Sequence, residues 1–320
     1  MNGRRTEYDV TNRINVTEVE PVCREVCRLY SELYPDRGVD TLRQAFTDMG
    51  RLFRGEYPGY MPCEAPYHDL QHTLDVTLAA ARLLTGYERS RLGSNDAIGQ
   101  LGVLLGLICA LFHDSGYIRR REGDDSSHGA ELTRTHVSRG GEFLSEYLPS
   151  IGLAHAVSLC TRLLHFTGYE MAVGEIQVDD PRLRLIGMLI GSADLLAQMA
   201  DRCYLEKCRD RLYPEFVASG MASYDQPSGG FASSEDLICK TPAFFKHVME
   251  DRLNGDFEGV FHHMEDYFGD GRNPYMEAIQ QNRRYLDGVI RRCNLSMLRR
   301  CPIWTLNPDV PEVELERYQQ

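Results

Sequence analysis

Apolar residues recur along most of the chain at intervals of three and four positions, the spacing that places them on one face of an α-helix. Strict alternation of apolar and polar residues, which is typical of strands, is not the dominant pattern. The sequence therefore predicts an all-α fold. Its helical segments are expected near residues 17–34, 39–54, 69–85, 96–115, 128–147, 151–167, 181–206, 235–253, 257–268 and 274–297.

Residues that start and stop helices stand between these segments. A residue with a side-chain oxygen just before a proline marks a helix start, because the oxygen can cap the first turn. Proline fits the first helical position because the amide hydrogen that it lacks would make no hydrogen bond within the helix there. This pattern predicts starts at Asp180, Thr241 and Asn273. Glycine adopts the left-handed conformation that closes a helix, and glycines after periodic stretches predict ends at Gly86, Gly116, Gly168 and Gly269.

Residues 219–234 are rich in glycine, serine and proline, which is typical of a mobile loop or of a joint between two parts of a chain. We therefore expect three parts. Residues 1–60 form N-terminal helices that pack on the core, residues 61–218 form a central bundle, and residues 219–320 form a linker loop and a C-terminal helical part.

The composition narrows the class of protein. Of 320 residues, 42% are hydrophobic and 26% charged, as in soluble globular chains, and 35 basic against 47 acidic residues give a net charge of −12. This charge argues against binding to nucleic acid or to an anionic membrane. The most apolar run, residues 101–112, is too short to span a bilayer, and the N-terminus lacks the apolar core of a signal peptide. Ten cysteines without a CxxC pair are expected to be reduced thiols in the cytoplasm.

Histidines and aspartates beside apolar segments are the candidates for chemistry. His68 and His72 are four residues apart and share one helix face. Asp114 follows His113 at the end of an apolar helix, where a carboxylate needs a compensating cation. Asp194 is an isolated acid in an apolar helix and needs a metal ion or an arginine. Each also has an ordinary structural explanation, as a packed core histidine or a hydrogen-bonded carboxylate.

The spacing of two further histidines joins these residues into one set. His136 follows Asp114 by 22 residues, and His165 and Asp194 follow at intervals of 29. Each interval is about one helix plus a turn, so in an antiparallel bundle the side chains return to one level. His128 is the rival to His136. Together the set contains four histidines and two aspartates, which are enough to hold two ions of Fe, Mn, Zn or Mg. Its members are His72, His113, Asp114, His136, His165 and Asp194.

The order His, His-Asp, His, His, Asp resembles the order of metal-binding residues in the HD-domain metal-dependent phosphohydrolase superfamily. In addition, Tyr67-His68-Asp69-x-x-His72-x-x-Asp75-Val76 is similar to the signature that opens the catalytic domain of class I cyclic nucleotide phosphodiesterases, which usually have Asn in place of Asp69. The resemblance extends over about residues 67–200. It implies an HD-domain helical bundle with additional N- and C-terminal helices, and hydrolysis of a small-molecule phosphate ester, above all a nucleotide-type phosphodiester.

The resemblance also implies roles for individual residues. His72, His113, Asp114 and Asp194 would hold one metal ion, and Asp114, His136 and His165 the other. A hydroxide bridging the two ions would attack phosphorus, and His68 would be the general acid that protonates the leaving oxygen. Asp75 is either an acceptor that orients an imidazole or a surface acid. The histidine that cyclic nucleotide phosphodiesterases carry shortly after the His-Asp doublet is missing here, so the resemblance does not single out cyclic nucleotides.

Other interpretations stay open at the level of sequence. The same ligand set serves mixed-valent di-iron oxygenases of the HD type, but a proton donor such as His68 has no required role in them and favours hydrolysis. A non-catalytic binding module, stabilised by metal, is the third class. Arg119, Arg120 and Arg121 follow the His-Asp doublet and are candidates for phosphate contact, although a run of charges is usually solvated.

Overall fold

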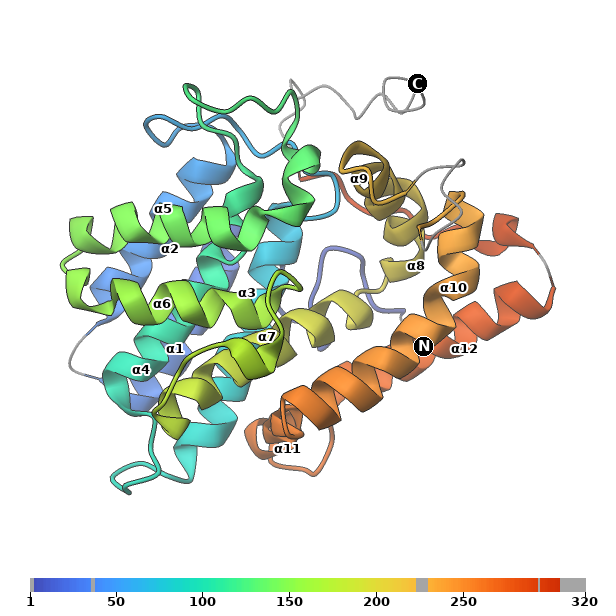
Figure 1. Cartoon of the computed structure of the whole chain (residues 1–320). Helices are drawn as coiled ribbons and strands as arrows, with labels where there is room; N and C mark the ends of the chain where they lie inside the picture. Colours follow the sequence, from blue (N-terminus) through green and yellow to red (C-terminus); the bar gives the residue numbers. More distant parts are fainter. Residues whose placement is uncertain (1–2, 36–37, 223–229, 293, 306–320) are drawn as a thin grey trace.

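The chain folds almost entirely into helices (Figure 1). A computed structural model describes residues 3–35, 38–222, 230–292 and 294–305, and within these ranges there is no β-sheet, only three isolated bridges. The all-α prediction is therefore confirmed. The α-helices are α1 (Val19–Leu33), α2 (Val39–Phe53), α3 (Leu70–Arg89), α4 (Gly99–Phe112), α5 (His136–Ser150), α6 (Val157–Leu164), α7 (Pro181–Ala200), α8 (Tyr204–Lys207), α9 (Tyr213–Ala218), α10 (Ser234–His247), α11 (His263–Phe268) and α12 (Pro274–Arg291).

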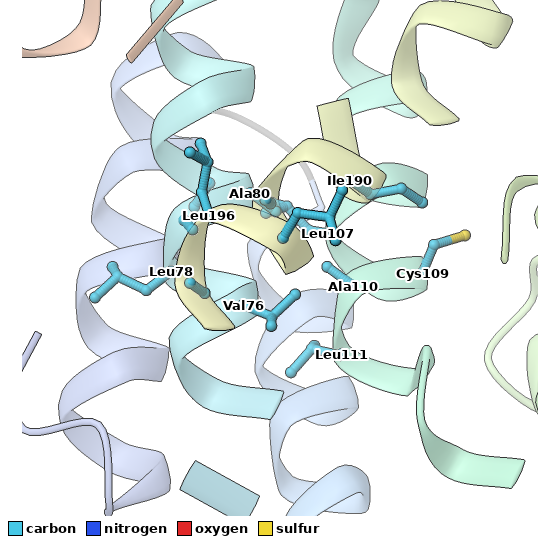
Figure 2. Close-up of a cluster of buried hydrophobic side chains, with 14 of the residues drawn as sticks. Val76, Leu78, Ala80, Leu107, Cys109, Ala110, Leu111, Ile190 and Leu196 are labelled. Atoms are coloured by element: carbon cyan, nitrogen blue, oxygen red, sulfur yellow. The ribbon is translucent and has the colours of Figure 1, made fainter. Parts of the chain in front are cut away.

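Helices α3, α4 and α7 form the centre of the molecule. Figure 2 shows where their apolar side chains meet, and those side chains are almost completely buried. Removing one Leu or Ile side chain of this size from water contributes roughly 1.5–3 kcal/mol to stability. The buried side chains labelled there are Val76, Leu78 and Ala80 of α3, Leu107, Cys109, Ala110 and Leu111 of α4, and Ile190 and Leu196 of α7.

Two of the central segments are apolar enough to be compared with membrane helices. By length and composition, Gly99–Tyr117 and Pro181–Ala200 could span a bilayer, but 83% and 78% of their apolar windows are buried inside the fold. Their hydrophobicity is therefore accounted for by the protein core.

The remaining elements surround this centre. Helices α1 and α2 pack on α3 and α4, and α12 packs on α7. One hydrophobic core extends from Val16 to Leu298, so all three parts expected from the sequence contribute to it. The expected boundaries at residues 60 and 218 stay predictions. Of the expected mobile loop, residues 223–229 lie outside the described ranges.

The structure corrects the sequence map at several helices, and two of these corrections lie next to the site. Residues 181–206 were expected to form one helix, but α7 ends at Ala200, and a turn at 201–203 leads to α8, a π-helical segment (Cys208–Leu212) and α9. Residues 128–147 were also expected to form one helix, whereas a 3₁₀ segment (Gly129–Arg134) precedes α5. The chain therefore bends next to both places, and these bends position residues of the site.

Two of the three predicted helix starts are confirmed. The carboxylate of Asp180 accepts a hydrogen bond from the Arg182 amide, and the Asn273 side chain accepts one from the Met276 amide. The start predicted at Thr241 is wrong, because Pro242 lies inside α10. That helix begins earlier, where the Ser233 hydroxyl accepts a hydrogen bond from the Asp236 amide and so provides the cap.

Among the glycines, Gly269 ends α11 with a φ of +74°, as predicted. Gly86 does not end a helix but lies within α3, where α11 crosses it. A Cβ atom at Gly86 would lie 2.0 Å from the carbonyl oxygen of His263. The absence of a side chain at Gly86 is therefore required by the helix crossing rather than by a turn.

Candidate metal centre

Three buried side chains from the central helices converge at one end of the bundle. His72 lies in the first turn of α3, His113 follows α4 directly, and Asp194 lies in α7. One potential ligand atom from each lies within 4.8 Å of the other two. His72 Nε2 is 3.3 Å and His113 Nε2 is 4.0 Å from Asp194 Oδ1. This group could hold a metal ion.

Asp114 faces the same point. Its Oδ2 is 3.0 Å from His113 Nε2 and 3.4 Å from His72 Nε2. Neither Asp114 Oδ2 nor His113 Nε2 has a hydrogen-bond partner in the described part of the chain, although both atoms are buried. Buried polar atoms are normally paired, so two such atoms facing each other fit a site that could hold a cation, either a proton or a metal ion.

The tautomer of His113 fits this interpretation. Its Nδ1–H donates to the carbonyl oxygen of Ala110 at 2.8 Å, so in the neutral ring the lone pair is on Nε2 and faces the two aspartates. Burial lowers the pKa of His113, but Asp114 and Asp194 reverse the effect and raise that pKa to about 9. The carboxylates thus create an environment that favours a cation, either a proton on His113 or a metal ion.

Burial alone would raise the pKa of Asp114, but His113, His68 and His72 together hold it well below its usual range. Asp114 is therefore ionised, which is the form in which a carboxylate binds a metal ion. Neutral imidazole nitrogens with ionised carboxylates suit the transition metals expected from the sequence, so the residues present fit such a group.

His136, in the first turn of α5, lies on the other side of Asp114. Its Nε2 is 3.9 Å from Asp114 Oδ1, and its Nδ1–H donates to the carbonyl oxygen of Thr133 at 2.7 Å. The approach of α5 requires a glycine, because a Cβ atom at Gly116 would lie 1.8 Å from the His136 carbonyl oxygen. Gly116 therefore acts here through close contact rather than as a left-handed cap.

His165 and His128 are placed differently. His165 follows α6 and is partly buried, and its Nδ1 is buried without a hydrogen-bond partner. Among the described contacts, no ion pair of 4.0 Å or less joins His165 to Asp114 or Asp194. His128 uses Nδ1 to accept a hydrogen bond from the Ala130 amide and so caps the 3₁₀ segment. Of the two rivals, His136 is the one that approaches Asp114.

His68 lies beside the cluster and is held by Glu215, a residue that no sequence motif singles out. The His68 Nδ1 is 2.6 Å from Glu215 Oε2, and the amides of Tyr67 and His68 donate to Glu215 Oε1 at 2.6 and 3.2 Å. Glu215 is completely buried. The rings of His68 and His136 both stack with the Tyr117 ring, with centroid distances of 4.4 and 4.5 Å, and lie 6.2 Å from each other.

The charge state of His68 follows from these neighbours. Burial lowers its pKa, but the carboxylates of Glu215, Asp114 and Asp194 outweigh burial and raise the pKa to about 9. Glu215 lies in α9, within a stretch for which the sequence map contained no helix. The only signal that points to it is a lone acid after Tyr-Pro, which is too common a pattern to select one residue.

The three arginines after the His-Asp doublet are engaged with the protein itself. Arg119 makes two hydrogen bonds of 2.7 Å to Glu64, Arg120 pairs with Glu146 at 2.9 Å, and Arg121 donates to the Gly55 carbonyl oxygen. A phosphate would therefore have to compete with these partners, and contact between it and the arginines stays a prediction.

Asp75 lies three residues after His72 and contributes to a small cavity of about 10 Å³, enough for roughly one water molecule. No hydrogen bond between Asp75 and a histidine occurs within the described ranges, and its Oδ1 is buried without a partner. Burial and repulsion from Asp201 and Asp9 raise the pKa of Asp75 to about 7. The cavity is lined by Tyr67, Gln71, His72, Asp75, Ala197, Gln198, Asp201 and Lys207.

Comparisons of the chain with models of protein families, with curated proteins and with solved structures find no match.

Proposed function

We propose that this chain is a metal-dependent phosphohydrolase that cleaves a phosphate ester, most specifically a nucleotide-type phosphodiester. The observation that carries the proposal is the pairing of His68 with the buried Glu215 directly beside the histidine–aspartate cluster. The resemblance to HD-domain enzymes, and the free thiols of the nine described cysteines, support a cytoplasmic enzyme of this type.

In this proposal His72, His113, Asp114 and Asp194 would hold a first metal ion, and Asp114 with His136 a second. His165 is the further ligand of the second ion that the resemblance implies. When bound, such ions supply Lewis acidity, which polarises a phosphoryl group and lowers the pKa of water. The protein holds His113 and His136 in the tautomer whose Nε2 lone pair is free to bind a metal ion. The carbonyl oxygens of Ala110 and Thr133 accept hydrogen bonds from the Nδ1 protons of these two rings.

His68 supplies the proton for the leaving oxygen. Its Nδ1–H donates to Glu215, so the other ring nitrogen, Nε2, is the atom from which a proton passes to substrate. Glu215 stabilises the protonated ring, and stacking on Tyr117 restricts its orientation. A buried carboxylate used to keep a histidine protonated favours ester cleavage over dioxygen chemistry, where such an acid has no required role.

Metal content and hydrolysis should be measured together. We expect about two transition-metal ions per chain and hydrolysis of bis-p-nitrophenyl phosphate under argon, with both lost in Asp114→Ala and neither lost in the exposed control Asp125→Ala. Iron with oxygen uptake and no hydrolysis would support the oxygenase instead. Bound metal with neither hydrolysis nor oxygen uptake would leave the non-catalytic binding module, and wild type unable to take up metal would refute the proposed metal centre.

The role of His68 has a test based on leaving groups. His68→Ala should retain the metal ions but lose about a hundredfold or more in turnover of esters with poor leaving groups. Nitrophenyl esters, whose leaving oxygen needs little protonation, should lose much less. Glu215→Gln should show the same selectivity in weaker form, because it retains a hydrogen-bond acceptor without the charge. Equal losses on both classes of ester would refute the assignment.

A further inference from the structure

Residues 298–305, which we term the C-terminal strap, follow α12 and return along the α8–α9 region toward the start of α3. The carbonyl oxygen of Leu298 accepts a hydrogen bond from Arg209, and the Arg300 amide donates to Glu206 at 3.1 Å. The strap is the red segment that passes beside α9 in Figure 1. It therefore connects the end of the described chain with α8 and the π-helical segment, which lead into α9 and Glu215.

The last residues of the strap reach Asp69, the residue that caps α3. The Thr305 hydroxyl donates to Asp69 Oδ2 at 2.7 Å, across 236 positions of sequence. Arg211 donates to the same oxygen at 3.1 Å and to the Ile303 carbonyl oxygen at 2.6 Å. The indole of Trp304 covers the Arg211 guanidinium at 4.3 Å. Arg211 and Asp69 are both completely enclosed, with exposed fractions of 1% and 0%.

The other oxygen of Asp69 connects this network with the candidate metal centre. Asp69 Oδ1 accepts a hydrogen bond from the His72 amide at 2.9 Å and so fixes the first turn of α3. His68 precedes this turn and His72 lies within it. A buried carboxylate with three donors is held rigidly, so a change at Thr305 or Arg211 is transmitted to the backbone that positions both histidines.

The aspartate also distinguishes this chain from the phosphodiesterase signature, which usually has asparagine here. A neutral amide needs no cation, whereas a buried carboxylate does. Arg211 provides that positive charge, and it is brought to Asp69 by the π-helical segment Cys208–Leu212. The carboxylate of Asp69, Arg211 and the strap are therefore parts of one hydrogen-bonded arrangement.

We propose that Arg211 and Thr305 are positioning residues of the metal centre, acting through Asp69 on His68 and His72. This inference rests on the proposed function, because it assumes that the cluster binds metal. Its test measures metal binding and does not require hydrolysis. Thr305→Val removes the hydroxyl donor while keeping the shape of the side chain, and Thr305→Ser restores the donor. Arg211→Met removes the cation, with Arg209→Met as a control that loses a strap contact without touching Asp69.

Co²⁺ is the probe, with affinity measured by competition against a chelator and geometry by the visible absorption of the bound ion. We expect Co²⁺ binding about tenfold weaker in Thr305→Val and Arg211→Met, as for loss of other outer partners of metal ligands, with an altered absorption band. Thr305→Ser and Arg209→Met should match wild type. Thermal unfolding of the metal-free proteins separates this effect from a general loss of stability.

Co²⁺ binding by wild type and variants distinguishes the positioning role of Thr305 and Arg211 from the proposed metal centre itself. If wild type binds Co²⁺ and all four variants bind it with the same affinity and spectrum, the positioning role is wrong while the metal centre stands. If Thr305→Ser is as weak as Thr305→Val, the hydroxyl of Thr305 is not the group that matters and the inference is overturned. If wild type binds no Co²⁺ at all, the proposed function itself is wrong.

Discussion

At the scale of single residues, the carboxyl group of Asp75 shows how a buried polar atom without a partner responds to pH. Burial is the largest cause of its raised pKa, and the carboxylates of Asp201 and Asp9 add to it, while Arg4 and Arg82 oppose it. His72 and Lys207 also face the same cavity. The result, a pKa of about 7, means that the folded protein binds a proton that the unfolded chain has released.

The folded protein is more stable while this carboxyl carries its proton. In the unfolded chain this carboxyl titrates near pH 4, so the stability contributed by the proton is present at low pH and is lost as the pH rises through about 7. Relative to wild type, Asp75→Asn should gain about 2 kcal/mol in unfolding free energy between pH 5 and pH 8. Urea unfolding at both pH values measures this gain. The exposed Asp125→Asn should show none, and a pH-independent difference for Asp75→Asn would contradict the explanation.

At the scale of elements, the crossing of α3 and α11 depends on Gly86. A Cβ atom there would meet the His263 carbonyl oxygen at 2.0 Å and the Tyr267 amide nitrogen at 3.0 Å. Both are backbone atoms and cannot move aside as a flexible side chain could. The two helices would have to separate, which disturbs packing along the whole of their contact.

Gly86→Ala should therefore lower the unfolding free energy by about 1–3 kcal/mol, the usual effect of overpacking. Gly288 is the matched control, because it lies in α12 and a Cβ atom added to it would have no neighbour within 4 Å. Gly288→Ala should stabilise the protein by about 0.5–1 kcal/mol through helix propensity. Thermal unfolding of the two variants should show shifts of opposite sign, and a neutral Gly86→Ala would mean that the crossing tolerates a methyl group.

At the scale of the whole molecule, a buried ion pair joins segments from both ends of the chain to α3. Arg82 of α3 contacts Asp9 at 2.6 Å and donates to the Tyr275 hydroxyl of α12 at 2.9 Å. Burial raises the pKa of Asp9, but Arg82 and two backbone amides outweigh this and lower it below its usual value. The stability from the ionised Asp9 is thus present above about pH 4 and is lost as the pH falls.

Asp9→Asn leaves the Arg82 charge buried without its counterion, and we expect a loss of about 3 kcal/mol in unfolding free energy at pH 7. The loss should shrink in acid, where the wild-type carboxyl becomes protonated. The exposed ion pair of Asp40 with Arg43 provides the comparison, and Asp40→Asn should change stability by less than about 1 kcal/mol. Similar small losses for both variants in urea unfolding would show that Asp9 does not connect these segments energetically.

The sequence by itself determined the all-α fold, because the three-to-four spacing of apolar residues follows from helix geometry alone. It also led to the histidines and aspartates that meet at the end of the bundle. The intervals between these residues match the length of a helix plus a turn, and such intervals can be counted along the sequence. The caps at Asp180 and Asn273 were predictable for the same reason, since a cap involves only neighbours within one turn.

Only the tertiary structure decided which partners complete the site. Glu215 meets His68 from 147 positions away, and Thr305 meets Asp69 from 236, and no local pattern encodes either contact. A glycine after a periodic stretch predicts a helix end at both Gly86 and Gly269. In the structure Gly86 allows a helix crossing, whereas Gly269 ends a helix. Their difference, like the partners of His68 and Asp69, depends on which elements pack together, and packing is a property of the folded chain rather than of any segment of it.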